Sequence, residues 1–346
     1  MRKSRVIEIA HLKIGGNNPV RVESMLKTHL SENFSHISEE LELLGATGCE
    51  LLRVAIPDEK AIPLIEKIKN ITTIPLMADI HFSEKLALKA IEDGIDSIRI
   101  NPGNMGMAST KRIVREAKFN RIPIRLGINA ASFKEPTGKG KKVAVKLVNI
   151  LLNIIREIEK EEYYDVIVSI KSSDVPTTIW ANEELVKKVS YPVHIGITEA
   201  GIPPEGIVKS SVGLGVLLAE GIGDTLRVSL TDKSYEEVKV GYSILKALNL
   251  RTRGVEIISC PTCGRCRLDV QNIVREVEKR TRGLKDSIKI AVMGCEVNGP
   301  GEAKDADIGI AGGVGCGLLF KKGKVLKKVR EEEVVNELLK ELEKNT

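Results

Sequence analysis

Short apolar, β-branched runs recur along the first 230 residues, and segments with apolar positions at helical spacing lie between them. Helical spacing is clearest in SEKLALKAIEDG, VAVKLVNILLNIIREIEK and SYEEVKVGYSILKALNL. The runs that predict strands span residues 20–24, 51–56, 75–80, 97–101, 123–129, 166–171, 192–198 and 225–230. Eight strands that alternate with helices predict parallel pairing and favour a closed (β/α)8 TIM barrel. An open doubly wound sheet is the alternative, but no GxGxxG motif follows the first strand.

The pattern changes after NLRTRGVE (249–256), a polar stretch that follows the last predicted barrel helix. Beyond it the sequence predicts a strand end at 257–259, an amphipathic helix at 268–282, a strand at 288–293, two short strands within 307–320 and a terminal helix at 331–343. We therefore expect two domains: a substrate-binding TIM barrel over 1–250 and a small α+β domain over 256–346. A chain of 346 residues is long enough for both.

Composition and charge argue against several classes of protein. Aromatic residues make up only 3%, too few for stacking platforms that bind single-stranded nucleic acid. A formal charge of +6 is too small to indicate nucleic acid or a membrane surface as the partner. No apolar run approaches the length of a membrane span, and the N-terminal residues lack the apolar core of a signal peptide. We expect a soluble, cytoplasmic protein.

Polar side chains stand at the C-terminal ends of the predicted strands, where such barrels carry their active sites. Five are cations on five different strands: Arg53, Arg99, Arg125, Lys171 and Arg227. Pairing with a carboxylate would explain any one of them equally well. Five uncompensated charges at one end of the barrel, however, would cost free energy, because unpaired charge is poorly solvated there. An anion with several oxygens would offset that cost through charge-assisted hydrogen bonds. We therefore expect a phosphate or diphosphate ligand.

The other polar residues at these strand ends are less specific. His81 is either a structural histidine or a substrate contact. Glu199, next to Thr198, either caps the following helix or transfers a proton. Asn101, Asn129 and Ser229 also stand at strand ends and complete the predicted site.

Cysteines are distributed unevenly. Cys49 stands alone and is expected to be a small buried apolar residue, whereas the other five lie in the last quarter: Cys260, Cys263, Cys266, Cys295 and Cys316. The first three form CPTCGRC, and Cys295 follows within MGCEVNGPGE. Such a thiolate loop suits zinc or an iron–sulfur cluster. A zinc ribbon would prefer a second CxxC pair, whereas this chain offers a single cysteine, Cys295. The pattern therefore favours an iron–sulfur cluster with four thiolate ligands, and zinc remains the alternative.

Seven motifs occur in the order in which one enzyme family carries them: ADIHF, RINPGN, GINA, GITEAG, EGIGDTLRVSL, CPTCGR and GCEVNGPGEA. Through them nearly the whole chain resembles the GcpE (IspG) family of 4-hydroxy-3-methylbut-2-enyl diphosphate synthases, in its short two-domain bacterial form. The resemblance implies an oxidoreductase of the methylerythritol phosphate route to isoprenoids. One difference is visible: ESMLKT (23–28) stands where the family usually has QSMT, which leaves the role of this segment open.

The resemblance also implies a cofactor and a ligand set. The cofactor is a [4Fe–4S] cluster held by Cys260, Cys263, Cys295 and Glu302, which replaces the four-thiolate expectation. Cys266 and Cys316 occupy positions that the family does not use as ligands. Electrons would come from flavodoxin, ferredoxin or both.

The implied reaction opens the ring of 2-C-methyl-D-erythritol 2,4-cyclodiphosphate reductively and removes a hydroxyl group as water. The five cations and Ser229 would hold the diphosphate, and Glu199 would deliver a proton. The residues that would orient the substrate are His81, Asn101, Asn129 and Thr198. Two alternatives from other classes stay open: a zinc-stabilised phosphate-binding barrel with non-redox lyase or transfer chemistry, and a non-catalytic redox sensor.

The sequence also predicts an assembly. The helix after the eighth strand, about 22 Å long, runs back from the mouth, so the chain leaves the barrel near its bottom. The linker 249–256 spans at most about 28 Å. A head-to-tail homodimer, in which the second domain of one chain closes the barrel of the other, avoids a stretched linker, and the family resemblance implies the same arrangement.

Overall fold

The computed structural model describes residues 2–29, 33–129, 138–284, 286–296, 301 and 303–344. The chain divides into two compact units, Met1–Arg251 and Thr252–Thr346. Each unit has its own sheet and its own hydrophobic core.

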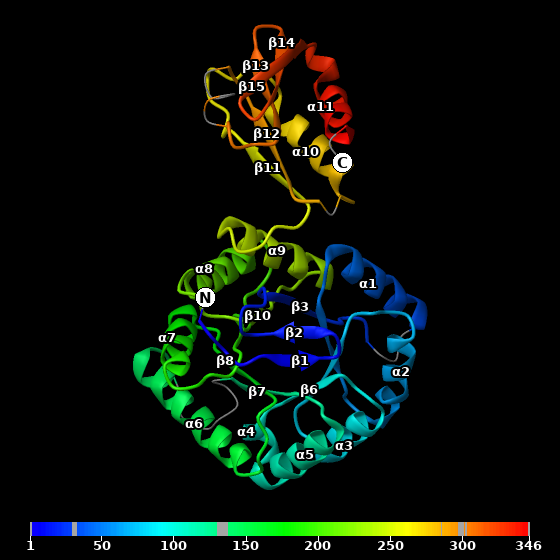
Figure 1. The fold of residues 1–346 in the computed structure, drawn as a ribbon, viewed down its shortest axis with the longest axis vertical. Helices are drawn as coiled ribbons and strands as arrows, with labels where there is room; N and C mark the ends of the chain where they lie inside the picture. The colour runs from blue at the N-terminus through cyan, green and yellow to red at the C-terminus, as the bar shows by residue number, and fades with distance from the viewer. Residues whose placement is uncertain are drawn as a thin grey trace. The chain divides into compact units, whose positions relative to one another are not determined.

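The first unit is a parallel barrel whose strands alternate with helices (Figure 1). Its strands are β3 (Arg21–Met25), β4 (Leu51–Ala55), β5 (Leu76–Ile80), β6 (Ser97–Ile100), β7 (Ile124–Asn129), β8 (Val166–Lys171), β9 (His194–Ile195) and β10 (Thr225–Leu226). They lie in the order β8-β7-β6-β5-β4-β3-β10-β9, and a parallel bridge between Val168 and Val193 joins the two ends. The predicted eight-stranded TIM barrel is confirmed, although β9 and β10 are shorter than their apolar runs.

Amphipathic helices cover the outside of the barrel. They are α1 (Phe34–Thr47), α2 (Pro63–Lys69), α3 (Glu84–Glu92), α4 (Pro102–Met105), α5 (Met107–Asn120), α6 (Lys141–Glu159), α7 (Val175–Val186), α8 (Glu205–Ala219) and α9 (Ser234–Ala247). Side-chain caps begin some of them: Ser83 accepts a hydrogen bond from Leu86 N in α3, and Asp174 accepts one from Thr177 N in α7. No helix within the described residues is both long and apolar enough to cross a membrane.

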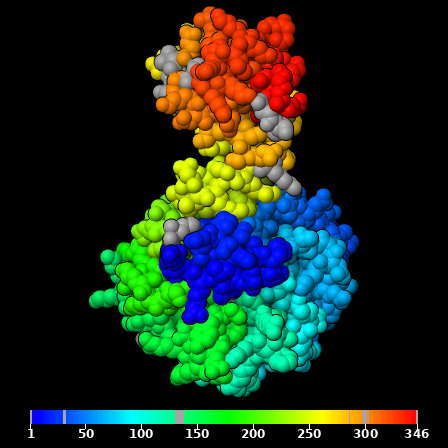
Figure 2. Space-filling model, viewed as in Figure 1, coloured from blue at the N-terminus to red at the C-terminus, as the bar shows by residue number. Residues whose placement is uncertain are grey.

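A hairpin at the N-terminus closes one end of the barrel. It consists of β1 (Ile7–Ile9) and β2 (Leu12–Ile14), each with two buried side chains. These pack against Leu51, Met77 and Ile167, which stand at or near the N-terminal ends of their strands. Figure 2 shows the N-terminal residues covering the centre of this face. The sequence analysis predicted no strand here, because three-residue strands are too short for a readable alternation.

The second unit is one five-stranded sheet with two helices on one face. The strands are β11 (Val255–Ser259), β12 (Ile288–Met293), β13 (Ile308–Gly313), β14 (Cys316–Lys321) and β15 (Lys324–Val329), in that order. The first three are parallel and the last two antiparallel. Helices α10 (Val270–Thr281) and α11 (Val334–Glu343) bury their apolar sides in the core. The edge strand β15 was not predicted, because nearly all of its Lys-rich sequence is exposed.

Candidate active site

A polar cavity of about 90 Å³ lies at the C-terminal ends of the barrel strands. All the predicted substrate contacts except Asn101 line it. The lining residues are Arg53, His81, Arg99, Arg125, Gly127, Asn129, Ser169, Lys171, His194, Thr198, Arg227 and Ser229. The barrel therefore brings together, at one place, cations from five separate strands or strand ends.

Arg53 and Arg99 share one carboxylate. Arg99 Nη1 donates to Asp79 Oδ1 at 3.1 Å, and Arg53 Nε lies 3.4 Å from Asp79 Oδ2. Asp79 and Arg99 are direct neighbours in the β5–β6 pairing. Burial alone would raise the pKa of Asp79, but the charges of Arg53 and Arg99 and the contact with His81 outweigh it and hold the pKa well below its usual value. Asp79 is therefore an anion that fixes two guanidinium groups.

Arg125 forms a fully buried ion pair with Glu23. The two side chains are each 1% exposed and reach across the barrel from β7 and β3. Burial opposes the charge on Glu23, yet Arg125 and His194 hold its pKa well below the usual value. Within the part of the chain that the structure describes, the buried Arg125 Nη2 has no hydrogen-bond partner, and the buried Arg53 Nε makes no hydrogen bond beyond its ion pair with Asp79. Buried donors of this kind are unusual, and a ligand oxygen in the cavity would satisfy them.

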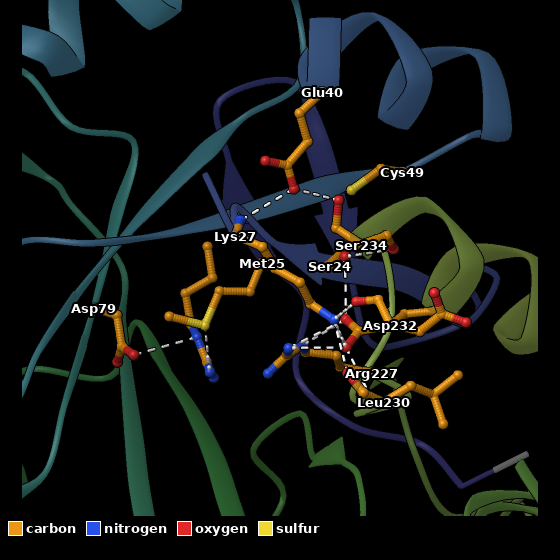
Figure 3. A network of polar contacts seen from close by, with 12 residues as sticks. Ser24, Met25, Lys27, Glu40, Cys49, Asp79, Arg227, Leu230, Asp232 and Ser234 are labelled. Carbon is orange, nitrogen blue, oxygen red and sulfur yellow. Dashed lines mark hydrogen bonds and ion pairs between the residues drawn. The ribbon is translucent and has the colours of Figure 1, made fainter. Parts of the chain in front are cut away.

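Arg227 follows β10 and is held by Glu237 from α9. Arg227 Nη2 lies 3.1 Å from Glu237 Oε2, and Lys27 Nζ lies 2.9 Å from Glu237 Oε1. Lys27 also donates to the backbone carbonyls of Leu230, at 2.8 Å, and Asp232 (Figure 3). This contact set ties the segment after β3 to the segment after β10 and keeps Arg227 at the cavity.

These pairs correct the expectation of uncompensated charge. Four of the five predicted cations, the arginines, meet the carboxylates of Glu23, Asp79 and Glu237, and Glu237 also binds Lys27. Glu237 lies on a helix and Glu23 lies inside a strand. Neither is at a predicted strand end, so their pairing with the cations could not be predicted from position alone. A surplus of positive charge remains, because the cations outnumber the carboxylates.

Lys171 differs from the arginines. Within the described part of the chain no carboxylate oxygen lies within 4 Å of its Nζ, and its contact is His194 Nε2 at 2.7 Å. Burial and the charges of Arg53, Arg125 and Arg227 lower the pKa of Lys171 well below its usual value. The other ring nitrogen, His194 Nδ1, lies 2.7 Å from Thr225 Oγ1.

Two glycines make room for these cations. A Cβ atom on Gly127 would lie 2.7 Å from Arg99 Nε, and one on Gly196 would lie 2.9 Å from Lys171 Nζ. Both distances are shorter than real side chains allow, so Arg99 and Lys171 lie across neighbouring strands only because these positions carry no side chain. The GINA and GITEAG motifs thus have a steric reason for their glycines.

Two predicted site residues lie elsewhere. Asn101 is buried, and its side chain accepts a hydrogen bond from Gly103 N at the start of α4. Glu199 is exposed, has a φ of +53° and does not line the cavity. Three residues of this site were not predicted from the sequence: His194, Glu23 and Glu237. For Glu23 the available signal was a carboxylate within the otherwise strand-like VRVESM.

Three cysteines of the second unit, Cys260, Cys266 and Cys295, lie where β11 and β12 end side by side. Cys260 follows β11, and its Sγ accepts a hydrogen bond from Gly294 N at 3.1 Å. A Cβ atom on Gly294 would lie 2.4 Å from Cys266 Sγ and 3.2 Å from Cys260 Sγ. Cys295 is buried and Cys263 is exposed. Gly294 is therefore a cradle against which two thiols lie, next to a third on Cys295.

This donor set fits a metal–sulfur group, since three thiols stand on one loop and Cys295 follows the neighbouring strand. Among the described residues no three Cys, His, Asp or Glu side chains are yet close enough to hold a metal ion. Glu302, the predicted carboxylate ligand, lies outside the described residues. In the first unit, Cys49 is buried as expected, and burial raises its pKa to about 12.

Comparisons with known proteins cover both units. The GcpE TIM-barrel domain matches residues 4–242, and the GcpE protein C-terminal domain matches residues 256–344. The chain is 52% identical to the 4-hydroxy-3-methylbut-2-en-1-yl diphosphate synthase (flavodoxin) of Caldanaerobacter subterraneus, over 99% of this chain and 98% of that protein. It is 49% identical to the protein of the same name from Thermodesulfovibrio yellowstonii, over 99% of both.

Solved structures resemble the barrel alone. The dihydropteroate synthase of Yersinia pestis superposes with a TM-score of 0.54 at 11% identity, covering 71% of this chain and 100% of that one. That of Xanthomonas albilineans has a TM-score of 0.52 at 14% identity, covering 72% and 100%. At such low identity the likeness extends to the fold and no further.

Proposed function

The chain belongs to the GcpE family, and from that membership we infer that it is a 4-hydroxy-3-methylbut-2-enyl diphosphate synthase, an iron–sulfur oxidoreductase of the methylerythritol phosphate pathway. It converts 2-C-methyl-D-erythritol 2,4-cyclodiphosphate to 4-hydroxy-3-methylbut-2-enyl diphosphate. The names of the relatives support flavodoxin as the electron donor, with ferredoxin as the alternative.

The observation that carries this function is the cationic cavity. Its arginines are held by carboxylates and outnumber them, and two of the arginines, Arg99 and Arg125, are buried. Among the described residues, the buried Arg125 Nη2 has no hydrogen-bond partner and Arg53 Nε has only its ion pair with Asp79, so both N–H groups are available to a multi-oxygen anion. Fixed guanidinium groups also hold a diphosphate at little cost in side-chain ordering, because their carboxylate partners have already ordered them.

Each predicted residue has a proposed task in or near the cavity. Arg53, Arg99, Arg125, Lys171 and Arg227 bind the two phosphates together with Ser229. His81, Asn129 and Thr198, which line the same cavity, orient the carbon skeleton. Asn101 contributes by capping α4 beside the site. Glu199, exposed at the rim, remains the proposed proton donor of the closed, substrate-bound enzyme.

For the cofactor we propose a [4Fe–4S] cluster held by Cys260, Cys263, Cys295 and Glu302. When bound, such a cluster supplies the two electrons of the reduction. The Gly294 cradle and the thiol donors support this set. Cys266 is a strong competitor for a ligand position, because its Sγ lies against the same glycine as that of Cys260.

We further propose a head-to-tail homodimer in which the partner's second unit completes the cavity. Arg251, the last residue of the first unit, donates to Val20 O and pairs with Glu50, both at 2.6 Å. Val20 and Glu50 immediately precede β3 and β4, so the barrel unit ends at the side opposite the cavity. This anchoring supports a partner chain as the source of the cluster.

Turnover under anaerobic conditions tests the function. Reconstituted protein is expected to contain iron and sulfide and to produce 4-hydroxy-3-methylbut-2-enyl diphosphate from the cyclodiphosphate when reduced flavodoxin is present. Omitting the reductant should abolish the product. Zinc in place of iron, or no product from an iron-loaded protein, would refute the assignment.

Mixing two inactive chains tests the dimer. Lys171→Met disables the barrel without leaving a carboxylate unpaired, and Cys263→Ser disables the cluster. Because a mixed dimer contains one intact barrel facing one intact cluster, activity is expected to reappear after subunit exchange. Exchange demonstrated by mass labelling with activity still absent would mean that each chain uses its own cluster.

A further inference from the structure

Lys171 and His194 form a buried pair whose nitrogens must share a hydrogen. Lys171 Nζ and His194 Nε2 are 2.7 Å apart, so one of them donates and the other accepts. If Lys171 were an ammonium and His194 a fully protonated imidazolium, two N–H donors would face each other and no hydrogen bond could form between them. On its far side the ring contacts Thr225 Oγ1, which accepts or donates equally well. The pair therefore holds a variable number of protons in a defined geometry.

The charged groups around this pair are mostly positive. They come from every neighbouring strand or strand end: Arg53 on β4, Arg125 on β7, Arg227 after β10 and Glu23 on β3. The one carboxylate among them, Glu23, is bonded to Arg125 through Oε2, and its Oε1 lies 3.3 Å from His194 Nδ1, which partly offsets the cations at the ring. Burial and these cations lower the pKa of Lys171 and of His194, and with no carboxylate within 4 Å of Lys171 Nζ among the described residues, the ligand-free cavity shifts the pair toward its less protonated forms.

We propose that the Lys171–His194 pair takes up a proton when the anionic substrate enters the cavity. This inference rests on the proposed function, since it takes the cavity to be the diphosphate site. Each phosphate brings a negative charge among the arginines and cancels the repulsion that kept the pair deprotonated. The ammonium form then gains a charge-assisted bond to a phosphate oxygen while it still donates to His194.

A proton stored there has a use in the reaction. Two electrons and one proton convert the cyclodiphosphate dianion to the diphosphate trianion and one water. The C2–O bond to phosphate breaks, the C3 hydroxyl leaves with the proton as water, and a carbon–carbon double bond forms. Substrate binding would thus bring the one proton that the reaction consumes into the cavity, in place of direct delivery from Glu199.

Calorimetry on the oxidised holoenzyme tests the proposal without turnover. The cyclodiphosphate is titrated into the protein in buffers of different ionisation enthalpy, at pH values from about 6.5 to 8.5. Each of its phosphates has one strongly acidic group, so the ligand itself changes no protonation. The wild-type binding heat is expected to depend on the ionisation enthalpy of the buffer, which shows net uptake of protons on binding within this pH range.

Three variants locate the proton. Lys171→Met should bind more weakly and take up essentially none, and Lys171→Arg should take up none while it keeps the charge. Lys85→Met, which removes an exposed lysine beside Glu59, should behave like the wild type. The two Lys171 variants together separate loss of the proton from loss of folding or affinity.

The outcomes distinguish this inference from the proposed function. Binding and turnover with a buffer-independent heat would overturn the proton uptake and leave the enzyme assignment intact. Proton uptake that persists in both Lys171 variants would place the proton on another group and would also overturn the inference about the Lys171–His194 pair. Failure of the cyclodiphosphate to bind to the wild type would overturn the proposed function, and this inference with it.

Discussion

The cavity of the barrel and the cysteine site of the second unit are built in opposite ways. In the cavity each arginine stands on or directly after a strand and is fixed by a carboxylate from another element. The cysteines stand on a loop and at the end of a strand, and Cys263 is exposed. Their thiols contact backbone groups such as Gly294 N and Leu268 O instead of charged partners.

The two sites differ in whether protein contacts alone, or a bound metal group, set their geometry. The barrel cavity has its geometry from protein contacts alone, so it is ready for an anion before the anion arrives. Thiolates repel one another until a metal group binds them, and binding then supplies the free energy that orders the loop. A change in the cavity should therefore alter stability or affinity, whereas a change in the cysteine set should remove the cofactor.

The largest expected effect is at the cysteines. Cys295→Ser and Cys260→Ser should each lose the cluster and essentially all activity, while the barrel stays folded. Cys266→Ser and Cys316→Ser should retain iron. Anaerobic reconstitution with iron counting and circular dichroism measures both properties. Loss of iron in Cys266→Ser with retention in Cys295→Ser would reverse the ligand assignment.

Glu23→Ala should destabilise the barrel by about 3–5 kcal/mol, because it leaves Arg125 buried without its counter-charge. Glu59→Ala, which removes an exposed carboxylate of the same unit, should change the stability far less, because water and salt screen its contacts with lysines. Urea unfolding at pH 7 measures both. Equal costs for the two variants would show that the buried pair does not hold the cavity together.

Arg227→Ala should weaken cyclodiphosphate binding by about 1.5–3 kcal/mol and leave the iron content unchanged. Its partner Glu237 keeps Lys27, so the loss of stability should be smaller than in Glu23→Ala. The exposed Arg112→Ala on α5 is the control and should bind normally. Calorimetry measures the affinity of each variant for the cyclodiphosphate. An affinity of Arg227→Ala equal to that of the wild type would show that this side chain does not contact the ligand.

The smallest expected effect is a pH dependence carried by Asp79. Its pKa is lower in the folded protein than in the unfolded chain, where it is about 3.9. The stability from this carboxylate is therefore fully present above about pH 5 and is lost as the pH falls below that. Asp79→Asn should be less stable than the wild type at pH 6, and the difference should shrink toward pH 3. A difference that stays constant over this interval would contradict the assignment.

Most of the barrel and much of the candidate site could be predicted from the amino-acid sequence. Alternating strand and helix patterns are local, so the eight strands and the small second domain were readable from single segments. The side chains at the C-terminal ends of parallel strands meet at one end of a barrel, so Arg53, Lys171 and Arg227 could be placed together. The motifs around Cys260 and Cys295 are also local patterns, and their cysteine spacing indicated the cofactor chemistry.

What only the tertiary structure decided is which distant groups meet. Glu23 and Arg125 are 102 positions apart, and their contact depends on the stagger of β3 and β7 around the barrel. Glu237 reaches Arg227 because α9 packs beside β3 and returns its first turns to the cavity. His194 became a partner of Lys171 because Gly196 leaves space between their strands. A sequence pattern reports the periodicity of one segment, whereas a buried ion pair depends on the register between segments, which closure of the barrel sets.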